Sequence, residues 1–207
     1  MTAAETNTKS VIPDVPYLPR DPKSYRPGIG LIGCGGITRD HLAAYRKAGY
    51  HVVAVCDVDE VRARSRQSEY FPGAVVYTDY NELLKRDDIE VVDITTHPPQ
   101  RPPIIEAALL ARKHVLSQKP FVLDLDVGER LVELAAKQNV KLAVNQNGRW
   151  SPHWSYARHA IEMGLLGFVS GVHLSVHWSH AWVEGTPFEQ VKHLLLYDYA
   201  IHWFVIT

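Results

Sequence analysis

A lysine followed by a proline stands directly after a short apolar run, in the stretch VLSQKPF. Proline fixes its own φ and disfavours helical geometry for the residue before it, so Lys119 is expected in an extended or turn conformation. An ammonium group held in this way points in a definite direction and can stabilise negative charge on a reacting oxygen. The same residues also suit an ordinary strand exit, so the elements around Lys119 must decide between the two interpretations.

A glycine-rich turn, GCGGIT, offers a second kind of chemistry at residues 33–38. Gly33 and Gly35 form a G-x-G pattern, which permits a tight turn and lets the backbone approach a pyrophosphate. The helix expected after the turn presents free N–H groups to that anion. Thr38 occupies the place of the third glycine, so the pattern is incomplete. Taken alone, it is also explained by a glycine-rich strand-to-helix turn without any ligand.

An acidic residue, Asp57, ends the next apolar run. It lies about 20 residues after the glycine turn, where dinucleotide-binding folds place the carboxylate that binds ribose hydroxyls. Such a carboxylate would repel the 2′-phosphate of NADP, and Val58, Asp59 and Glu60 follow it without a basic residue. The two features together predict NAD rather than NADP as the cofactor. The alternative for Asp57 is a turn or N-cap residue of the following helix.

Near the end of the sequence, Asp198 and His202 are four residues apart. On a helix, these two side chains would share a face. The ordinary pKa of an imidazole suits a group that accepts and returns a proton, and Asp198 could orient the ring or bind a substrate hydroxyl itself. An Asp–His pair at this spacing is also common as a surface or capping pair.

These residues must be positioned by a regular alternation of apolar runs and amphipathic segments. Strands are predicted at 28–33, 51–57, 74–78, 90–96, 114–118 and 140–145, and helices at 37–49, 58–70, 80–88, 102–113 and 126–139. This alternation predicts an α/β fold of the Rossmann type, a doubly wound parallel sheet with helices on both faces. Ligands bind such a sheet at the edge formed by the carboxyl ends of its strands. That edge is expected to gather Gly33, Asp57, Thr95, Thr96, Gln118, Lys119 and Asn145.

Four stretches in order, GIGLIGCGGITRDHL, CDVD, KHVLSQKPF and DYAIHW, resemble the glucose–fructose oxidoreductase, inositol dehydrogenase and rhizopine-catabolism family (Gfo/Idh/MocA). The resemblance runs from about residue 28 to the end. The glycine turn is common to many Rossmann domains, whereas the Lys-Pro pair and the later Asp…His pair are more specific. Three positions depart from the family pattern: Gln118 replaces the usual Glu, Ala200 replaces a Gly, and Val205 stands where an acidic residue is common.

The resemblance implies an NAD-dependent oxidoreductase that transfers hydride between nicotinamide and a secondary alcohol of a sugar, inositol or related polyol. It implies His202 as the leading acid/base with Lys119 as its partner, the reverse assignment staying open, and Asp198 beside them. The cofactor-binding residues expected on this basis are Gly33, Gly35, Gly36, Ile37, Thr38, Asp57, Thr95, Thr96, His97, Gln118, Lys119 and Asn147. The alternative is a non-catalytic dinucleotide-binding fragment or pseudoenzyme of the same family.

Three parts are predicted along the chain: an N-terminal arm at 1–27, an NAD-binding Rossmann domain at 28–147, and the incomplete start of an α+β substrate and oligomerisation domain at 148–207. A helix is expected at 153–163 and another from near Asp198. The resemblance implies a continuation well beyond Thr207. The chain is therefore expected to be a fragment or a naturally short version, too short to be active alone, and a full-length version is expected to form a homo-oligomer.

Charge and composition narrow the class of protein. A net charge of −1 without long runs of one sign argues against binding to nucleic acid or membrane surfaces by charge. No segment has the character of a signal peptide or of a membrane-spanning helix. Cys34 and Cys56 are too few for a disulfide framework, so a reducing cytoplasm is the expected location.

The stretch VHLSVHWSH alternates apolar and polar residues, which predicts a half-buried strand at 172–179. His173 and His177 would share its polar face two pleats apart, too far to chelate one ion without other ligands, and His180 would depart from that face. No metal site is therefore expected. A polar face that lines a sugar pocket or a subunit interface is the favoured interpretation.

Overall fold

The computed structural model describes residues 12–175 and 177–206. Within these residues lies one sheet of six parallel strands: β1 Gly28–Ile32, β2 His51–Cys56, β3 Val75–Tyr77, β4 Val91–Ile94, β5 His114–Gln118 and β6 Leu142–Asn145. Their order across the sheet is β3-β2-β1-β4-β5-β6. Because the order reverses between β1 and β4, a crevice opens at the carboxyl ends of these two strands. The predicted Rossmann-type fold is confirmed.

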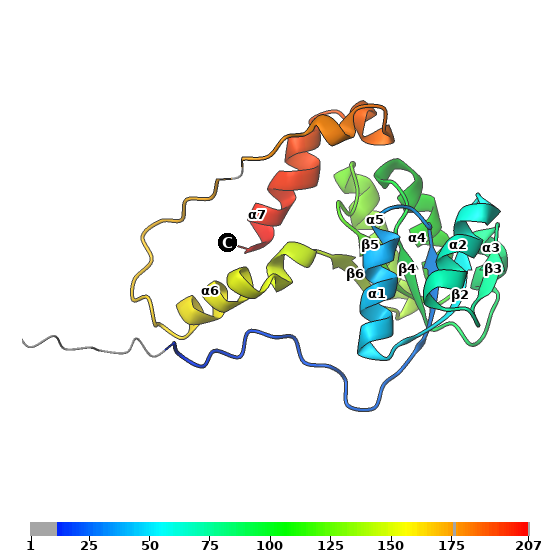
Figure 1. Ribbon diagram of the computed structural model, residues 1–207, viewed down its shortest axis with the longest axis horizontal. Coiled ribbons are helices and arrows are strands. Elements are labelled where there is room, and N and C mark those ends of the chain that lie inside the picture. The colour runs from blue at the N-terminus through cyan, green and yellow to red at the C-terminus, as the bar shows by residue number, and fades with distance from the viewer. Residues whose placement is uncertain (1–11, 176, 207) are drawn as a thin grey trace, which may run out of the picture.

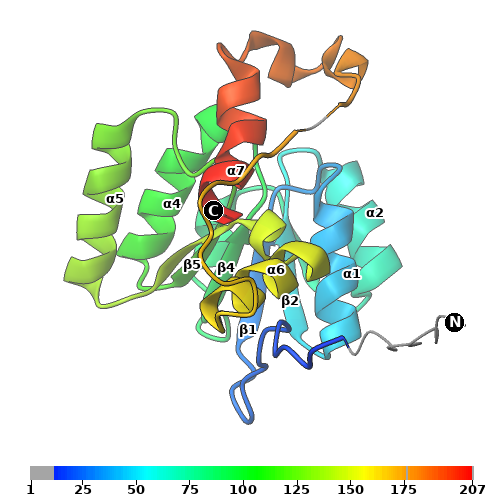
Figure 2. The same ribbon diagram turned by 90° about the vertical axis from the view of Figure 1, so that its left-hand side faces the viewer.

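Helices cover both faces of the sheet, as Figure 1 and Figure 2 show together. They are α1 Thr38–Ala48, α2 Glu60–Tyr70, α3 Tyr80–Leu84, α4 Arg101–Leu110 and α5 Leu125–Gln138. Figure 2 shows α4 and α5 on one side of the sheet and α1 and α2 on the other. None of the described helices is long and apolar enough to cross a membrane.

Each face of the sheet has its own hydrophobic cluster, because strands covered on both sides bury side chains in both directions. Leu31 and Leu42 are fully buried in the cluster beneath α1 and α2. Ile94 and Ile105 belong to the larger cluster beneath α3, α4 and α5. These two clusters make the sheet the rigid part of the molecule that positions the strand ends.

The helix boundaries follow from local chemistry. Asp59, Asp79 and Asp124 cap the N-termini of α2, α3 and α5, because each side chain accepts a backbone N–H of the first turn. Gly49 and Asn139 end α1 and α5 in the left-handed conformation that these two residues adopt most readily. The helix predicted at 80–88 ends early, at residue 84, because its last residues form turns that lead into β4.

Beyond the sheet, the chain forms separate short elements. They are the 3-10 helices η2 Asn147–Trp150, η3 Ala181–Val183 and η4 Pro187–Gln190, the π-helix η5 Leu195–Ala200, and the α-helices α6 Pro152–Glu162 and α7 Ile201–Ile206. The helices expected at 153–163 and near residue 198 are therefore present. The strand expected at 172–179 is wrong: its described residues have no regular secondary structure and are mostly exposed. Alternation alone cannot make a strand without a neighbour to share its hydrogen bonds.

The N-terminal segment, drawn in blue, runs along α6 before it enters the sheet (Figure 1). The rings of Tyr17 and Tyr156 meet edge to face at 5.9 Å, and the hydroxyl of Tyr156 donates to the carbonyl of Pro13. Ser155 donates to the carbonyl of Tyr17, and Val15 is buried. Residues 12–27 therefore form a strap over the surface, while residues 1–11 lie outside the described part.

Candidate active site

The turn between β1 and α1 requires glycine at its first position. Gly33 has a φ of +97°, and a Cβ there would lie 2.9 Å from the backbone nitrogen of Thr96. At Gly35 and Gly36, in contrast, a Cβ would meet nothing within 4 Å, so this backbone faces open space. Ile37, the N-cap residue of α1, makes no side-chain cap hydrogen bond. No side chain caps α1; the N–H groups of Arg39 and Asp40 donate to the carbonyls of Gly36 and Ile37 at 3.3 and 3.0 Å, while the open backbone of Gly35 and Gly36 can approach an anion.

Thr38, in place of the third glycine, supports this turn from inside. Its hydroxyl donates to the carbonyl of Gly33 at 2.7 Å and lies 2.9 Å from the hydroxyl of Thr95. The hydroxyl of Thr95 lies 2.6 Å from the same carbonyl. Both threonines are buried. The incomplete glycine pattern thus keeps its turn because two hydroxyl groups hold the carbonyl of Gly33.

Asp57 joins the glycine turn to the start of α2. Its Oδ2 accepts the backbone N–H of Cys34 at 2.7 Å, and its Oδ1 accepts that of Asp59 at 2.9 Å. The N-cap of α2 is Asp59, whose side chain accepts the N–H of Arg62. Asp57 is therefore the turn residue before the cap and not the cap itself. Its carboxylate is 8% exposed, at the edge of the sheet where a ribose would lie.

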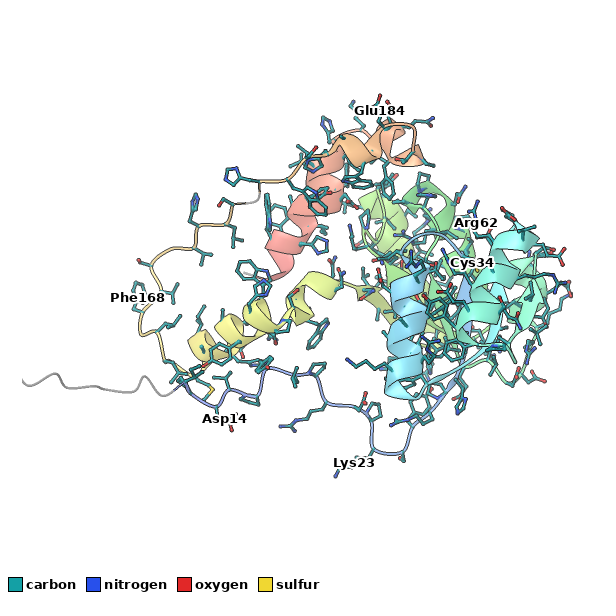
Figure 3. All side chains as sticks on the ribbon, viewed as in Figure 1. Asp14, Lys23, Cys34, Arg62, Phe168 and Glu184 are labelled. Atoms are coloured by element: carbon teal, nitrogen blue, oxygen red, sulfur yellow. The ribbon has the colours of Figure 1, made fainter. Side chains whose placement is uncertain are left out.

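Two arginines of α2 approach this carboxylate and the glycine turn. The guanidinium of Arg62 lies 4.0 Å from Oδ2 of Asp57, and Arg66 donates to the carbonyl of Gly35 at 3.4 Å. Figure 3 shows Arg62 and Cys34 close together in this region. The residues directly after Asp57 carry no positive charge. Arg62 and Arg66 are four residues apart, so they share a face of α2 and both reach the site. That spacing is a signal that the sequence of α2 itself contains.

A pocket of about 420 Å³ opens above the glycine turn. The predicted site residues that line it are Gly35, Gly36, Ile37, Thr95, Thr96, His97, Gln118, Lys119, Asn147 and Asp198. The other residues that line it are Asp40, Pro98, Arg101, Trp182 and Phe188. Gly33, Thr38, Asp57 and His202 are not part of its lining. The fold therefore brings most of the predicted set, from the glycine turn to residue 198, around one cavity.

Lys119 forms an ion pair across this pocket. Its Nζ lies 2.6 Å from Oδ1 of Asp198 and 3.1 Å from the backbone carbonyl of the same residue. The two side chains are only 17% and 10% exposed. The Lys119–Pro120 peptide bond is cis. The lysine that follows β5 is thus aimed at an acidic group carried by η5.

His202 does not pair with Asp198, although the two are four residues apart. The intervening helix changes from the π-form of η5 to the α-form of α7, so the regular i, i+4 face is lost. Within the described residues, Nδ1 of His202 is buried without a partner, and a Cβ on Gly148 would lie 2.8 Å from it. Burial lowers the pKa of His202, the charge of Lys119 lowers it further, and Asp198 acts in the opposite direction.

Arg101 ties together the two loops that carry the pocket. It is 2% exposed. Its Nε and one terminal nitrogen donate to the carbonyl of Thr96 at 3.2 and 2.5 Å, and the other terminal nitrogen donates to the carbonyls of Gln118 and Pro120. Burial lowers the pKa of Arg101 to about 10, opposed by the charge of Asp198. The guanidinium therefore stays charged at neutral pH and fixes the loops after β4 and β5.

One wall of the pocket is aromatic and comes from the segment after residue 180. The ring of Phe188 meets His97 at 5.1 Å and Trp182 at 5.5 Å. Burial lowers the pKa of His97, and the charges of Arg101 and Arg62 lower it further, so this imidazole is held neutral. The sequence offered no signal for this wall, because no regular pattern marks residues 181–190.

The histidines of the segment that was expected as a strand lie apart from this site. The described parts of 172–180 do not line the pocket, and the ring of His180 packs against Tyr199 at 4.5 Å. Among the described residues, no group of three or more His, Cys, Asp or Glu side chains is placed to hold a metal ion. Cys34 and Cys56 are buried free thiols whose pKa burial raises to about 12.

The chain is similar in sequence to known dehydrogenases. The chain is 30% identical over 174 residues to D-apiose dehydrogenase of Paraburkholderia graminis, covering 83% of the chain and 46% of that relative. It is 30% identical over 176 residues to inositol 2-dehydrogenase of Salmonella typhimurium, covering 84% of the chain and 51% of that relative. The chain thus spans about half the length of these curated relatives.

A solved structure and a family model agree with these relatives. Scyllo-inositol dehydrogenase of Lactobacillus casei, with bound cofactor NAD(H) and scyllo-inositol, superposes with a TM-score of 0.63 at 25% identity, covering 69% of this chain and 43% of that one. Residues 28–146 match the model described as an oxidoreductase family with an NAD-binding Rossmann fold. Since that match covers more than half of the chain, the protein belongs to the Gfo/Idh/MocA oxidoreductase family and carries its NAD-binding domain.

Proposed function

We propose that this site oxidises a secondary alcohol of a sugar, inositol or related polyol, with NAD as the hydride acceptor. The observation that supports it best is the ion pair of Lys119 and Asp198, which lines the same pocket as the open glycine turn. A dinucleotide that lies along this edge ends its nicotinamide near that pair.

Residues of the site suit two groups of the cofactor, the pyrophosphate and the adenosine ribose. Gly35 and Gly36 present open backbone and the uncapped N-terminus of α1 to the pyrophosphate. Asp57 lies where it can accept hydrogen bonds from the adenosine ribose, and its negative charge favours NAD over NADP even with Arg62 at 4.0 Å. The nicotinamide of bound NAD supplies the hydride acceptor.

The reaction needs two transfers from the alcohol. The hydride leaves the carbinol carbon with its electron pair, and the hydroxyl proton goes to a base. The electron pair of the O–H bond then forms the carbonyl bond between that carbon and the oxygen. Lys119 would hydrogen-bond the reacting oxygen and stabilise its developing negative charge, while Asp198 would hold the ammonium and a substrate hydroxyl. Both residues reach the pocket, which favours contact with the reacting atoms.

Two groups are candidates for the base. The lowered pKa of His202 keeps its imidazole neutral and ready to accept a proton at neutral pH. Its Nδ1 faces Gly148, however, and its side chain does not line the pocket. Lys119 lines it directly. We therefore keep both assignments, with His202 as the acid/base if the ring turns toward the substrate and Lys119 if it does not.

The substrate class rests on the relatives. D-Apiose dehydrogenase and inositol 2-dehydrogenase are named for polyhydroxylated substrates, and the Lactobacillus casei neighbour holds scyllo-inositol. A second candidate function is dinucleotide binding without turnover. It is favoured by Ala200, which is buried where the family pattern has a glycine.

Fluorescence titration with NADH tests the cofactor site. We expect NADH to bind the wild-type chain. Asp57→Ala should weaken this binding at least about tenfold, because it removes charge-assisted hydrogen bonds to the ribose. NADPH should bind more weakly than NADH. Asp87→Ala removes an exposed carboxylate at the opposite end of the sheet and is the matched control. Equal NADH affinity in the Asp57 and Asp87 variants would refute the ribose role.

A panel of inositols and sugars with NAD tests turnover. Formation of NADH that Lys119→Ala lowers by about a hundredfold or more supports the oxidoreductase assignment. Lys47→Ala, at an exposed lysine of α1, is the control. Intact NADH binding with no turnover of any polyol would favour the non-catalytic candidate, and full activity of Lys119→Ala would remove this lysine from the chemistry.

A further inference from the structure

A buried carboxylate lies in the central strand β4, behind the pocket. Asp93 is fully buried, and its Oδ2 accepts the hydroxyl of Tyr45 at 2.8 Å and faces Nδ1 of His41 at 2.7 Å. Its Oδ1 has no hydrogen-bond partner within the described residues. Burying a carboxylate costs free energy unless hydrogen-bond partners offset that cost.

The far side of the His41 ring reaches the ends of β5 and β6, where Gln118 lines the pocket. His41 comes from α1 and is 8% exposed. Its Nε2 lies 3.2 Å from Nε2 of Gln118, at the end of β5, and 3.1 Å from Nδ2 of Asn145, at the end of β6. The ring therefore connects the middle of β4 to two side chains at the edge where the pocket opens.

The orientation of the Gln118 amide determines the state of this ring. Oε1 of Gln118 accepts the backbone N–H of Lys119 at 2.6 Å. A backbone N–H requires an acceptor, so the amide oxygen faces Lys119 and the NH₂ group faces His41. Nε2 of His41 must then accept a hydrogen bond, and its proton must sit on Nδ1, where it is donated to Asp93. A carboxylate at position 118 would require a second proton, on Nε2, in addition to the proton on Nδ1.

We propose that His41 is a positioning residue for Lys119. Asp93 holds the imidazole with its proton on Nδ1, the imidazole holds the amide of Gln118, and that amide holds the backbone of Lys119 immediately before Pro120. We call this chain of contacts from Asp93 through His41 and Gln118 to Lys119 the relay. It rests on the proposed function in one respect only: that function supplies the reacting oxygen that the ammonium of Lys119 would face. It also accounts for glutamine at a position where the family pattern has glutamate, because an amide can donate to His41 and accept from Lys119 at once.

Amide hydrogen exchange of Lys119 in the full chain tests the relay. His41→Asn retains an N–H near the position of Nδ1 for Asp93 but loses the acceptor for Gln118. We expect exchange at Lys119 to accelerate about tenfold, the loss of one net hydrogen bond, while buried amides of β4 keep their protection. Tyr45→Phe removes the other hydrogen bond of Asp93 and should leave Lys119 unchanged. Unchanged exchange at Lys119 in His41→Asn, or equal acceleration in β4, would overturn the proposal.

A second measurement keeps the histidine in place. Burial lowers the pKa of His41, but the hydrogen bond and charge of Asp93 raise it by more, so imidazole ¹⁵N shifts are recorded at mildly alkaline pH. We expect the neutral ring with its proton on Nδ1 in the wild-type chain and a doubly protonated ring in Gln118→Glu. The same ring state in both chains would overturn the proposal. Neither measurement uses NAD or a polyol, so a failure of the proposed function would leave both results interpretable.

Discussion

The ammonium of Lys119 and the carboxylate of Asp198 lie 2.6 Å apart, although 79 positions separate them in the sequence. One follows the fifth strand of the sheet and the other belongs to a π-helix in the segment beyond it. Both side chains are largely withdrawn from water. This contact therefore joins the nucleotide-binding sheet to the later part of the chain at the wall of the pocket.

Removing one partner of this pair should destabilise the chain more than removing both. Lys119→Met leaves the carboxylate of Asp198 buried and unpaired, and we expect it to lower the free energy of unfolding by about 3 kcal/mol. The double variant Lys119→Met/Asp198→Leu should recover part of that loss. Urea unfolding measures both, with the exposed change Lys47→Met as control. A double variant as unstable as the sum of the two single variants would show that the ion pair contributes nothing by itself.

Alanine at two glycines of the same turn should affect different properties of the chain: its stability at Gly33 and its affinity for NADH at Gly36. Gly33→Ala meets a φ of +97° and a backbone nitrogen at 2.9 Å, so we expect a loss of about 2 kcal/mol or more in the free energy of unfolding. Gly36→Ala meets open space, so stability should hold while the affinity for NADH falls, because the new methyl group occupies the approach of the pyrophosphate.

Thermal unfolding and NADH titration of the two glycine variants separate these effects. The expectation fails if Gly36→Ala binds NADH as tightly as the wild-type chain, or if Gly33→Ala unfolds at the wild-type temperature.

Arg101→Lys should be far from conservative. A lysine ammonium lacks the planar fork with which the guanidinium reaches the carbonyls of Thr96, Gln118 and Pro120. We expect the free energy of unfolding to fall by about 2 kcal/mol, since buried carbonyls lose their donors. Faster amide exchange should appear in the loops after β4 and β5. The exposed Arg130→Lys is the matched control, and equal stability of the two variants would contradict the role of Arg101 as a tie between loops.

His202 should make the chain less stable in acid. Its folded pKa is lowered from 6.5, chiefly by burial, so the unfolded chain takes up a proton at a higher pH than the folded one. Stability is therefore lost as pH falls through 6.5 and toward the lower folded pKa, and is fully present above 6.5. His202→Asn should flatten this slope in urea unfolding at a series of pH values. The lowered pKa of His97 also makes the chain less stable as pH falls. An unchanged slope in His202→Asn would therefore show that the pH dependence does not come from His202.

The strand ends could be placed from the sequence because each depends on a local pattern. Apolar runs that alternate with helices define β1 to β6, and the residue after each run must lie at the same edge of a parallel sheet. Thr96, Gln118 and Lys119 were placed by that rule and line one pocket. The strand expected at 172–179 failed, because an alternating pattern describes a half-buried face without naming the strand that would pair with it.

The sequence by itself determined the sheet, the glycine turn and the strand-end residues, because periodicity and turn chemistry act over a few neighbouring positions. Only the tertiary structure decided that Lys119 meets Asp198, that Arg101 binds three carbonyls, and that His41 faces Gln118. These contacts join residues whose partners lie on other elements, and burial makes each polar group require a partner that local pattern does not specify.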